Sequence, residues 1–270
     1  MSDSLHDRVF SEYRHKKIGS AGCCRECGKT PGISRPASYW HIGVEYERSK
    51  PRILFVGKTM TDLEDANTLY GVLDGSQHGR CFLREGFSAF WCRTKEIAAE
   101  FFHEPGDTAI ERIAISNMVK CSNSHRDDKT TPAMKMNCMV TLGAFPAELA
   151  ILHPTLVVCY AGDDYDVPIM GALALLAGQQ GWTLQQRTNA NTRFPGRGRT
   201  KKLWKWVIEL QSSGRPVMRF LTTSHPQGKA QDHFVHSIAN WLRENEALGG
   251  GDSRNGQVRR VTTTSPAHPI

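Results

Sequence analysis

Residues Glu111 to Cys138 read ERIAISNMVKCSNSHRDDKTTPAMKMNC, and the rest of the chain is organised around them. An apolar run that begins at Ile113 leads to Asn117. Open parallel sheets bind their ligands in the crevice outside the carboxyl ends of their strands. If the run is a buried strand, Asn117 is therefore well placed to read a ligand. Cys121 lies just past this run, and Cys138 lies in the helix predicted to follow.

Three further runs have the length and apolar character of buried strands, and segments with apolar residues at helical spacing separate them. The predicted strands are 52–56, 113–119, 155–160 and 217–222. The predicted helices are 5–17, 84–102, 132–152 with a bend or break at Pro146, 168–177 and 231–248. This alternation predicts an α/β fold, a three-layer sandwich with a central, mostly parallel four-stranded sheet.

Composition divides the chain into three parts. Residues 1–50 form an N-terminal arm that carries paired cysteines, 51–248 form the main domain, and 249–270 are rich in Gly, Ser, Thr and Pro, so we expect disorder there. No apolar run reaches the roughly 18 residues of a membrane span. The first residues lack the basic-then-apolar order of a signal peptide. We therefore expect a cytoplasmic protein that does not enter a membrane, and a monomer.

The net charge of +7 favours a polyanionic partner, although a generally basic surface would give the same total. Clustering favours the partner, because one segment is crowded with basic residues and has no acidic residue among them. These residues are Arg187, Arg193, Arg197, Arg199, Lys201, Lys202 and Lys205. The segment 181–203 is interpreted as a basic insertion that could hold nucleic-acid phosphates.

The cysteines carry the strongest chemical signal. In a cytoplasmic protein, eight cysteines are more readily thiols or metal ligands than disulfides. Cys24 and Cys27 place two thiolates on one tight turn, and with Cys121 and Cys138 they make a set of four. Four thiolates suit an iron-sulfur cluster, and a tetrahedral zinc ion would accept the same set. Cys23 competes for the first position, and four unrelated buried thiols are the alternative.

The order of these features resembles the uracil-DNA glycosylase superfamily, in particular its iron-sulfur family-four enzymes. The similarity runs from about Cys24 to Trp241. It rests on the two N-terminal cysteines, the strand ILFVG at 53–57, Gly79-Arg80-Cys81-Phe82, Ser116-Asn117-Met118-Val119-Lys120-Cys121, Asn137-Cys138, the Pro-Thr-Leu-Val-Val run at 154–158, and Ser224-His225-Pro226-Gln227.

The resemblance implies roles for several residues and a 4Fe-4S cluster on the four cysteines. Gly57 would line the base-binding site and Phe82 would stack on the extruded base. Asn117 would pair with the base edge, because an amide supplies both a donor and an acceptor. His225 would donate to the uracil O2 as the leaving anion develops. The base must first be flipped out of the stack.

The chain departs from the family at its first motif. The family has an acidic residue after the glycine, where its carboxylate assists the attacking water, whereas this chain has Lys58. Asp62 or Glu64 could take over that role, and Asp62 is our candidate. A lysine at this position also allows an amine nucleophile that attacks the sugar carbon.

Two functions follow from this sequence. The first is a glycosylase that removes uracil or another damaged base from single- or double-stranded DNA. The second is a non-catalytic module of the same fold that binds nucleic acid or a modified base, for example in a defence system. The missing acid favours the second, and the combination of Phe82, Asn117 and His225 favours the first.

Overall fold

The computed structural model describes residues 4–16, 18, 40–59, 75–86, 88–120, 130–161, 163–188, 193–196, 199–202, 204–227 and 231–249. The helices are α1 (Leu5–His15), α3 (Gly75–Glu85), α4 (Ala89–Phe102), α5 (Gly106–Ala109), α6 (Pro132–Met136), α7 (Ala144–Leu152), α8 (Asp166–Gln180) and α9 (Gln231–Glu244), with short turns η2 (Tyr46–Arg48), η3 (Ile110–Arg112), η4 (Asn137–Thr141), η5 (Asp163–Tyr165) and η6 (Glu246–Gly249). The strands are β1 (His41–Ile42), β2 (Ile53–Gly57), β3 (Ile113–Asn117), β4 (Leu156–Tyr160), β5 (Thr183–Thr188), β6 (Arg193–Gly196), β7 (Arg199–Lys202), β8 (Trp204–Ser212) and β9 (Arg215–Thr223).

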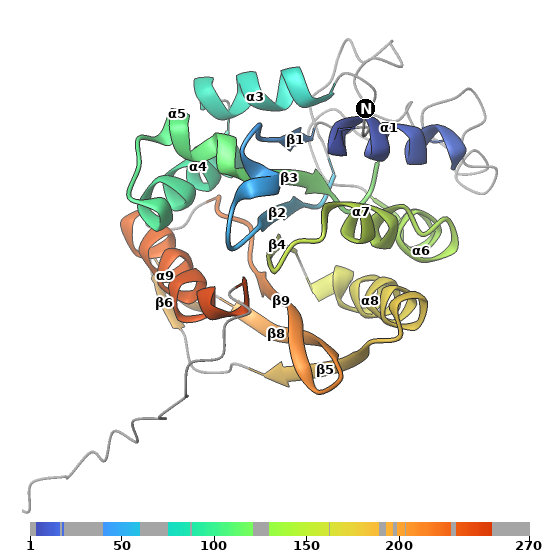
Figure 1. Ribbon diagram of the computed structural model, residues 1–270. Coiled ribbons are helices and arrows are strands. Elements are labelled where there is room, and N and C mark those ends of the chain that lie inside the picture. Colours follow the sequence, from blue (N-terminus) through green and yellow to red (C-terminus); the bar gives the residue numbers. More distant parts are fainter. Residues whose placement is uncertain are drawn as a thin grey trace, which may run out of the picture.

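The main sheet of the described residues has seven strands in the order β1-β3-β2-β4-β9-β8-β5 (Figure 1). The four predicted strands are its parallel centre, β3-β2-β4-β9. The expected four-stranded sheet was too small, because β1 is added antiparallel at one edge and the β8 and β5 pair is added antiparallel at the other. The fold is therefore mixed α/β, with a mixed rather than mostly parallel sheet.

The central strands are apolar because helices cover both of their faces (Figure 1). In β2, Leu54 and Val56 pack with α1, α7 and α8, whereas Ile53 and Phe55 pack with α4 and α9. Successive side chains of a strand point to opposite faces, so one apolar run supplies two separate cores. Helix α1 and strand β1, from the predicted N-terminal arm, belong to the same folded unit: α1 packs in the first core, and β1 pairs with β3.

Two predicted helices are divided by glycines rather than by proline. The segment predicted as one helix, 84–102, spans the end of α3 and all of α4, and Gly86 between them has a φ of 68°, which an L residue rarely adopts. The segment predicted as one helix, 132–152, consists of α6, the π-helical turn η4 and α7. Gly143, with a φ of 61°, separates η4 from α7. Pro146 does not bend it, because this proline lies in the first turn of α7, where no backbone donor is needed. No helix in the described ranges combines the length and apolar character needed to cross a bilayer.

Strands β8 and β9 form a hairpin that the sequence reading missed. The turn between them places Ser213 at a φ of 50° and Gly214 at 75°. Two consecutive residues with positive φ are typical of the tight turns that match strand twist. The Ser-Gly pair before an alternating run was the available signal for this hairpin.

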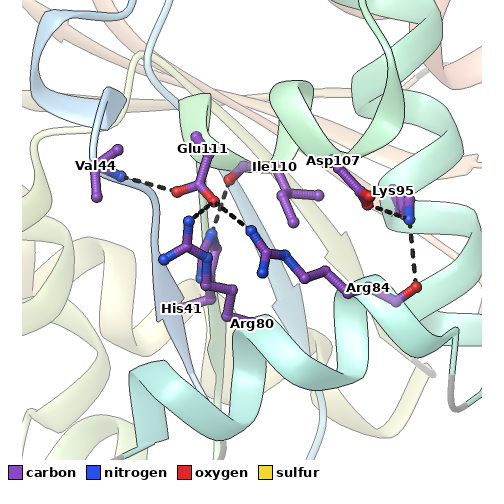
Figure 2. A network of polar contacts seen from close by, with 8 residues as sticks. All are labelled: His41, Val44, Arg80, Arg84, Lys95, Asp107, Ile110 and Glu111. Atoms are coloured by element: carbon purple, nitrogen blue, oxygen red, sulfur yellow. Dashed lines mark hydrogen bonds and ion pairs between the residues drawn. The ribbon is translucent and has the colours of Figure 1, made fainter.

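Helix α3 is fastened to the β1 edge of the sheet by charged groups (Figure 2). Arg80 and Arg84 both reach the Glu111 carboxylate, Arg84 at 3.8 Å, and the Val44 backbone N–H donates to the same group at 3.4 Å. Lys95 donates to the Arg84 carbonyl oxygen at 3.4 Å, close to the end of the helix. One carboxylate thus holds two successive turns of α3.

His41 lies beneath this cluster and supplies a pH-dependent contribution to stability. Burial, opposed by a 2.8 Å contact with the Ile110 carbonyl and by Glu111, lowers the pKa of His41 below its ordinary 6.5. The unfolded chain then takes up a proton before the folded one does. The contribution of His41 to the free energy of unfolding is fully present above pH 6.5. It decreases as the pH falls from 6.5 towards the pKa of His41 in the folded protein. We expect a loss of at most about 1.4 kcal/mol per pH unit, the limit for one proton.

Chemical denaturation of the wild type and of His41→Gln between neutral and mildly acidic pH tests this expectation. Glutamine keeps a donor for Ile110 and cannot be protonated in this range, so the variant should have the shallower pH slope. Equal slopes would show that His41 is not the group responsible.

Candidate base-binding site

The carboxyl ends of β2 and β3 are neighbours at the same end of the parallel strands, next to the switch point of the sheet between β2 and β4. The chain that leaves β2 continues to α4 on one face, whereas the chain that leaves β3 continues to α7 on the other. Connections that diverge in this way leave a crevice outside adjacent strand ends, which is where such sheets bind ligands. Gly57 and Asn117 are paired neighbours at these strand ends.

Gly57 and Asn117 are in close contact. A Cβ atom on residue 57 would lie 2.4 Å from the Asn117 Oδ1 atom and 3.2 Å from the Phe90 ring. Real Cβ atoms do not approach another heavy atom so closely, so only glycine allows the amide and the ring to take these places. The Asn117 side chain is 3% exposed. The ends of β2 and β3 therefore hold a buried amide packed against the Gly57 backbone, with the Phe90 ring beside it.

Phe90 is a further candidate site residue, which the sequence analysis counted only among the apolar positions of a predicted helix. Its ring packs edge-to-face on Tyr160, from the end of β4, with centroids 5.4 Å apart, and on Trp91 at 5.0 Å. The predicted stacking residue, Phe82, is half-buried on α3 and packs on Trp91 at 5.6 Å. Its role in base stacking stays a prediction, and Phe90 is the ring that lies beside Gly57.

His225 follows β9, whose carboxyl end lies at the same edge of the sheet. It is partly buried, and the Gln227 backbone N–H donates to its Nδ1 atom at 3.3 Å. A ring nitrogen that accepts carries no proton, so the neutral imidazole holds its proton on Nε2. In this tautomer Nε2 is the donor atom of the ring.

Lys58 lies where the enzymes that the sequence resembles have an acidic residue. Its Nζ atom is 5.6 Å from the centre of the buried Tyr165 ring, and Lys135 Nζ is 4.3 Å from the same centre. Lys135 also forms an ion pair with Asp164. Burial raises the pKa of Asp164, but the hydrogen bond and charge of Lys135 and the charge of Lys58 outweigh it, so the pKa lies below the ordinary value. Asp164 is thus a carboxylate near Lys58, whereas Asp62 lies outside the described residues.

Cys138 is the one predicted metal ligand within the described residues, and Cys24, Cys27 and Cys121 lie outside them. It is 2% exposed, sits in the π-helical turn η4, and accepts the Lys120 backbone N–H at 3.4 Å. Such a hydrogen bond to sulfur suits a thiolate that holds a cluster, and π-turns are frequent at functional sites. The described part of the chain brings no three His, Cys, Asp or Glu side chains together as a metal site. The set of four cysteines stays a prediction.

The basic segment contains β-structure instead of a plain insertion. Strands β6 and β7 pair antiparallel, with Arg193 opposite Lys202 and Phe194 opposite Lys201, and Arg199 lies opposite Gly196. Arg197 lies outside the described residues. The backbone therefore places four of the five predicted DNA-binding residues on one pair of short strands, namely Arg193, Arg199, Lys201 and Lys202. Their contact with DNA stays a prediction.

A second missed feature is a buried ion pair behind Asn117. Glu148 on α7 is 1% exposed and lies 2.5 Å from the Lys120 amine. The signal was a single acidic residue in the otherwise apolar helix AFPAELAIL. Such a residue has to be paired if the helix is buried.

No family model matches this chain, and no curated protein is significantly similar to it.

Proposed function

We propose that this protein is a DNA glycosylase that hydrolyses the N-glycosidic bond of uracil or a related deaminated base in DNA. The proposal rests on one observation above all, the Asn117 amide held against Gly57 beside the Phe90 ring at the carboxyl ends of β2 and β3. An amide there can pair with the donor and acceptor edge of a flipped base, and an aromatic face can cover its ring. The resemblance to the iron-sulfur family of uracil-DNA glycosylases supports the same reading.

In this mechanism the bond between the sugar C1′ atom and the base breaks, and the base leaves as an anion. His225 donates from Nε2 to the uracil O2 as negative charge develops, and a water molecule adds to C1′. Asp62 is the proposed activator of that water, and Asp164 is a second carboxylate near the crevice. Stabilisation that appears only as charge develops is what raises the rate.

The remaining assignments belong to the same proposal. Phe82 takes part in base stacking, and the hairpin residues Arg193, Arg197, Arg199, Lys201 and Lys202 contact DNA phosphates. Cys24, Cys27, Cys121 and Cys138 hold a 4Fe-4S cluster or, alternatively, zinc, and when bound this group supports the structure by tying their three segments together. The fold is the three-layer sandwich of that family, and the protein acts as a cytoplasmic monomer.

The test is an abasic-site assay. Labelled single- and double-stranded oligonucleotides that carry uracil, hypoxanthine or xanthine are incubated with the protein and then treated with alkali. We expect cleavage at one of these bases, and a rate about 10²-fold lower for His225→Ala. His236→Ala is the matched control, because His236 pairs with Glu100 on the surface and should keep the wild-type rate.

Absence of cleavage on every substrate, with DNA still bound, would contradict the proposal. The protein would then be the non-catalytic module that reads nucleic acid or a modified base, which the lysine at position 58 favours.

A further inference from the structure

The Lys120 and Glu148 side chains form a fully buried ion pair directly behind the candidate site. They are 0% and 1% exposed, and Nζ lies 2.5 Å from Oε1. The pair joins the segment after β3 to helix α7. Removing two charges from water costs free energy that their attraction does not always recover, so such a pair is weak evidence for a stabilising role. Another role has to be sought in its remaining contacts.

Most of those contacts return to the carboxyl end of β3. The Lys120 amine donates to the Ser116 hydroxyl at 2.8 Å and to the Asn117 carbonyl oxygen. The Ser116 hydroxyl in turn donates to Glu148 Oε2 at 2.5 Å. The Ser116 side chain and the backbone carbonyl of Asn117 itself are thereby held by one buried ion pair.

The same carboxylate reaches the N-terminal helix. The Tyr13 hydroxyl of α1 donates to Glu148 Oε1. Burial, together with the negative charge of Glu148, raises the pKa of Tyr13 well above its ordinary value, so the hydroxyl stays a donor. Helices α1 and α7 and the end of β3 are therefore joined by one buried polar network.

We propose that Lys120 and Glu148 are positioning residues that fix the Asn117 end of β3 against α1 and α7 for base recognition. The inference rests on the proposed glycosylase function. Asn117 must be held to within a fraction of an ångström to favour the transition state, and a misplacement of about 1 Å can cost about 10²-fold in rate. The Lys120 amine, paired with Glu148, donates to the backbone carbonyl oxygen of Asn117 and supplies that constraint from within the protein core.

The test replaces the network by apolar side chains of similar size, in the variant Tyr13→Phe/Lys120→Met/Glu148→Leu. Apolar replacement of a complete buried pair is often neutral or stabilising, so the variant should fold. We expect kcat for base excision to fall about 10²-fold while KM stays within about threefold, because DNA contacts outside the pocket are retained. Wild-type kcat in the folded variant would overturn the proposal and leave the network a purely structural feature.

The matched control is Glu209→Leu/Arg219→Met. Glu209 is also 1% exposed and pairs with Arg219 at 2.7 Å, but this pair lies between β8 and β9, away from Asn117. It should leave kcat within about twofold of the wild type. An equal loss of kcat in both variants would mean that general loosening of the sheet, not positioning of Asn117, is responsible, and would overturn the proposal.

Two further measurements keep the proposal testable. If the triple variant does not fold, Ser116→Ala removes only the hydroxyl between Lys120 and Glu148, and unchanged kcat there would overturn the proposal. If the wild type itself has no activity, hydrogen exchange of the backbone amides tests the positioning role without an activity assay. Amides of 113–120 should exchange at least about tenfold faster in the triple variant, with β4 unchanged, and equal exchange in 113–120 would overturn the positioning role independently of the function.

Discussion

Asn117→Ala is expected to lower kcat for uracil excision by about 10²- to 10³-fold, the usual cost of removing one preorganised polar group from an active site. The wild-type amide is 3% exposed and cannot be replaced by bulk water without opening the crevice. Its loss removes both the donor and the acceptor that we propose to pair with the base edge. KM for DNA should change little, because the proposed phosphate contacts lie on the β6–β7 strands rather than at Asn117. Steady-state kinetics on the best substrate of the abasic-site assay measure both constants.

Asn240→Ala is the control for this change. Asn240 lies on α9 and accepts a hydrogen bond from Arg243 at 2.7 Å, far from the ends of the parallel strands in sequence and topology. It should retain wild-type kcat. A kcat for Asn117→Ala within about tenfold of the wild type would show that another group reads the base, since a single lost hydrogen bond at the reacting centre has a larger effect.

Gly57→Ala is expected to lower both stability and activity. The added Cβ would lie 2.4 Å from Asn117 Oδ1 and 3.2 Å from Phe90, so the amide or the strand must move. Forcing an extra methyl group into a packed site costs about 1–3 kcal/mol. A displaced Asn117 should also lower kcat about 10²-fold. Urea denaturation and single-turnover kinetics measure the two effects.

Gly178→Ala is the matched control, because a Cβ at this position in α8 would meet nothing within 4 Å. Alanine in a helix interior should stabilise the protein by about 0.5–1 kcal/mol and leave kcat unchanged. If Gly57→Ala kept wild-type kcat, the contact between Gly57 and Asn117 would not be part of the reaction site.

The sequence predicted the centre of the sheet and missed its edges for a physical reason. Strands such as 156–160 are covered on both faces and therefore read as continuous apolar runs. The edge strand β1 has two residues, and β5 reads TLQQRT with exposed Gln185 and Gln186, so neither has a pattern to detect. Mixed polarity at an edge strand also limits its pairing with other sheets. Because of this mixed polarity, edge strands are the hardest strands to predict from sequence.

The candidate site was predictable where it depends on strand ends. Asn117 and Gly57 each close an apolar run, and parallel pairing then places them side by side. Phe90 and the Lys120–Glu148 pair were not predictable in the same way, because their partners come from helices on opposite faces. Which helical side chain meets a strand end depends on packing angles that periodicity does not encode.

The anchoring of α3 on Glu111 affects how a salt titration of this protein would be read. Ion pairs at the surface weaken as counterions screen them. Added salt therefore weakens the contacts of Arg80 and Arg84 with Glu111 that hold α3 against the sheet. DNA affinity also falls with salt, in proportion to the phosphates neutralised. If the protein binds DNA as proposed, with Phe82 of α3 in the site, both the weakening of the α3 ion pairs and the release of counterions from DNA lower the affinity as salt is added. A plot of DNA affinity against salt concentration then becomes steeper. The slope would then count more released ions than there are phosphate contacts.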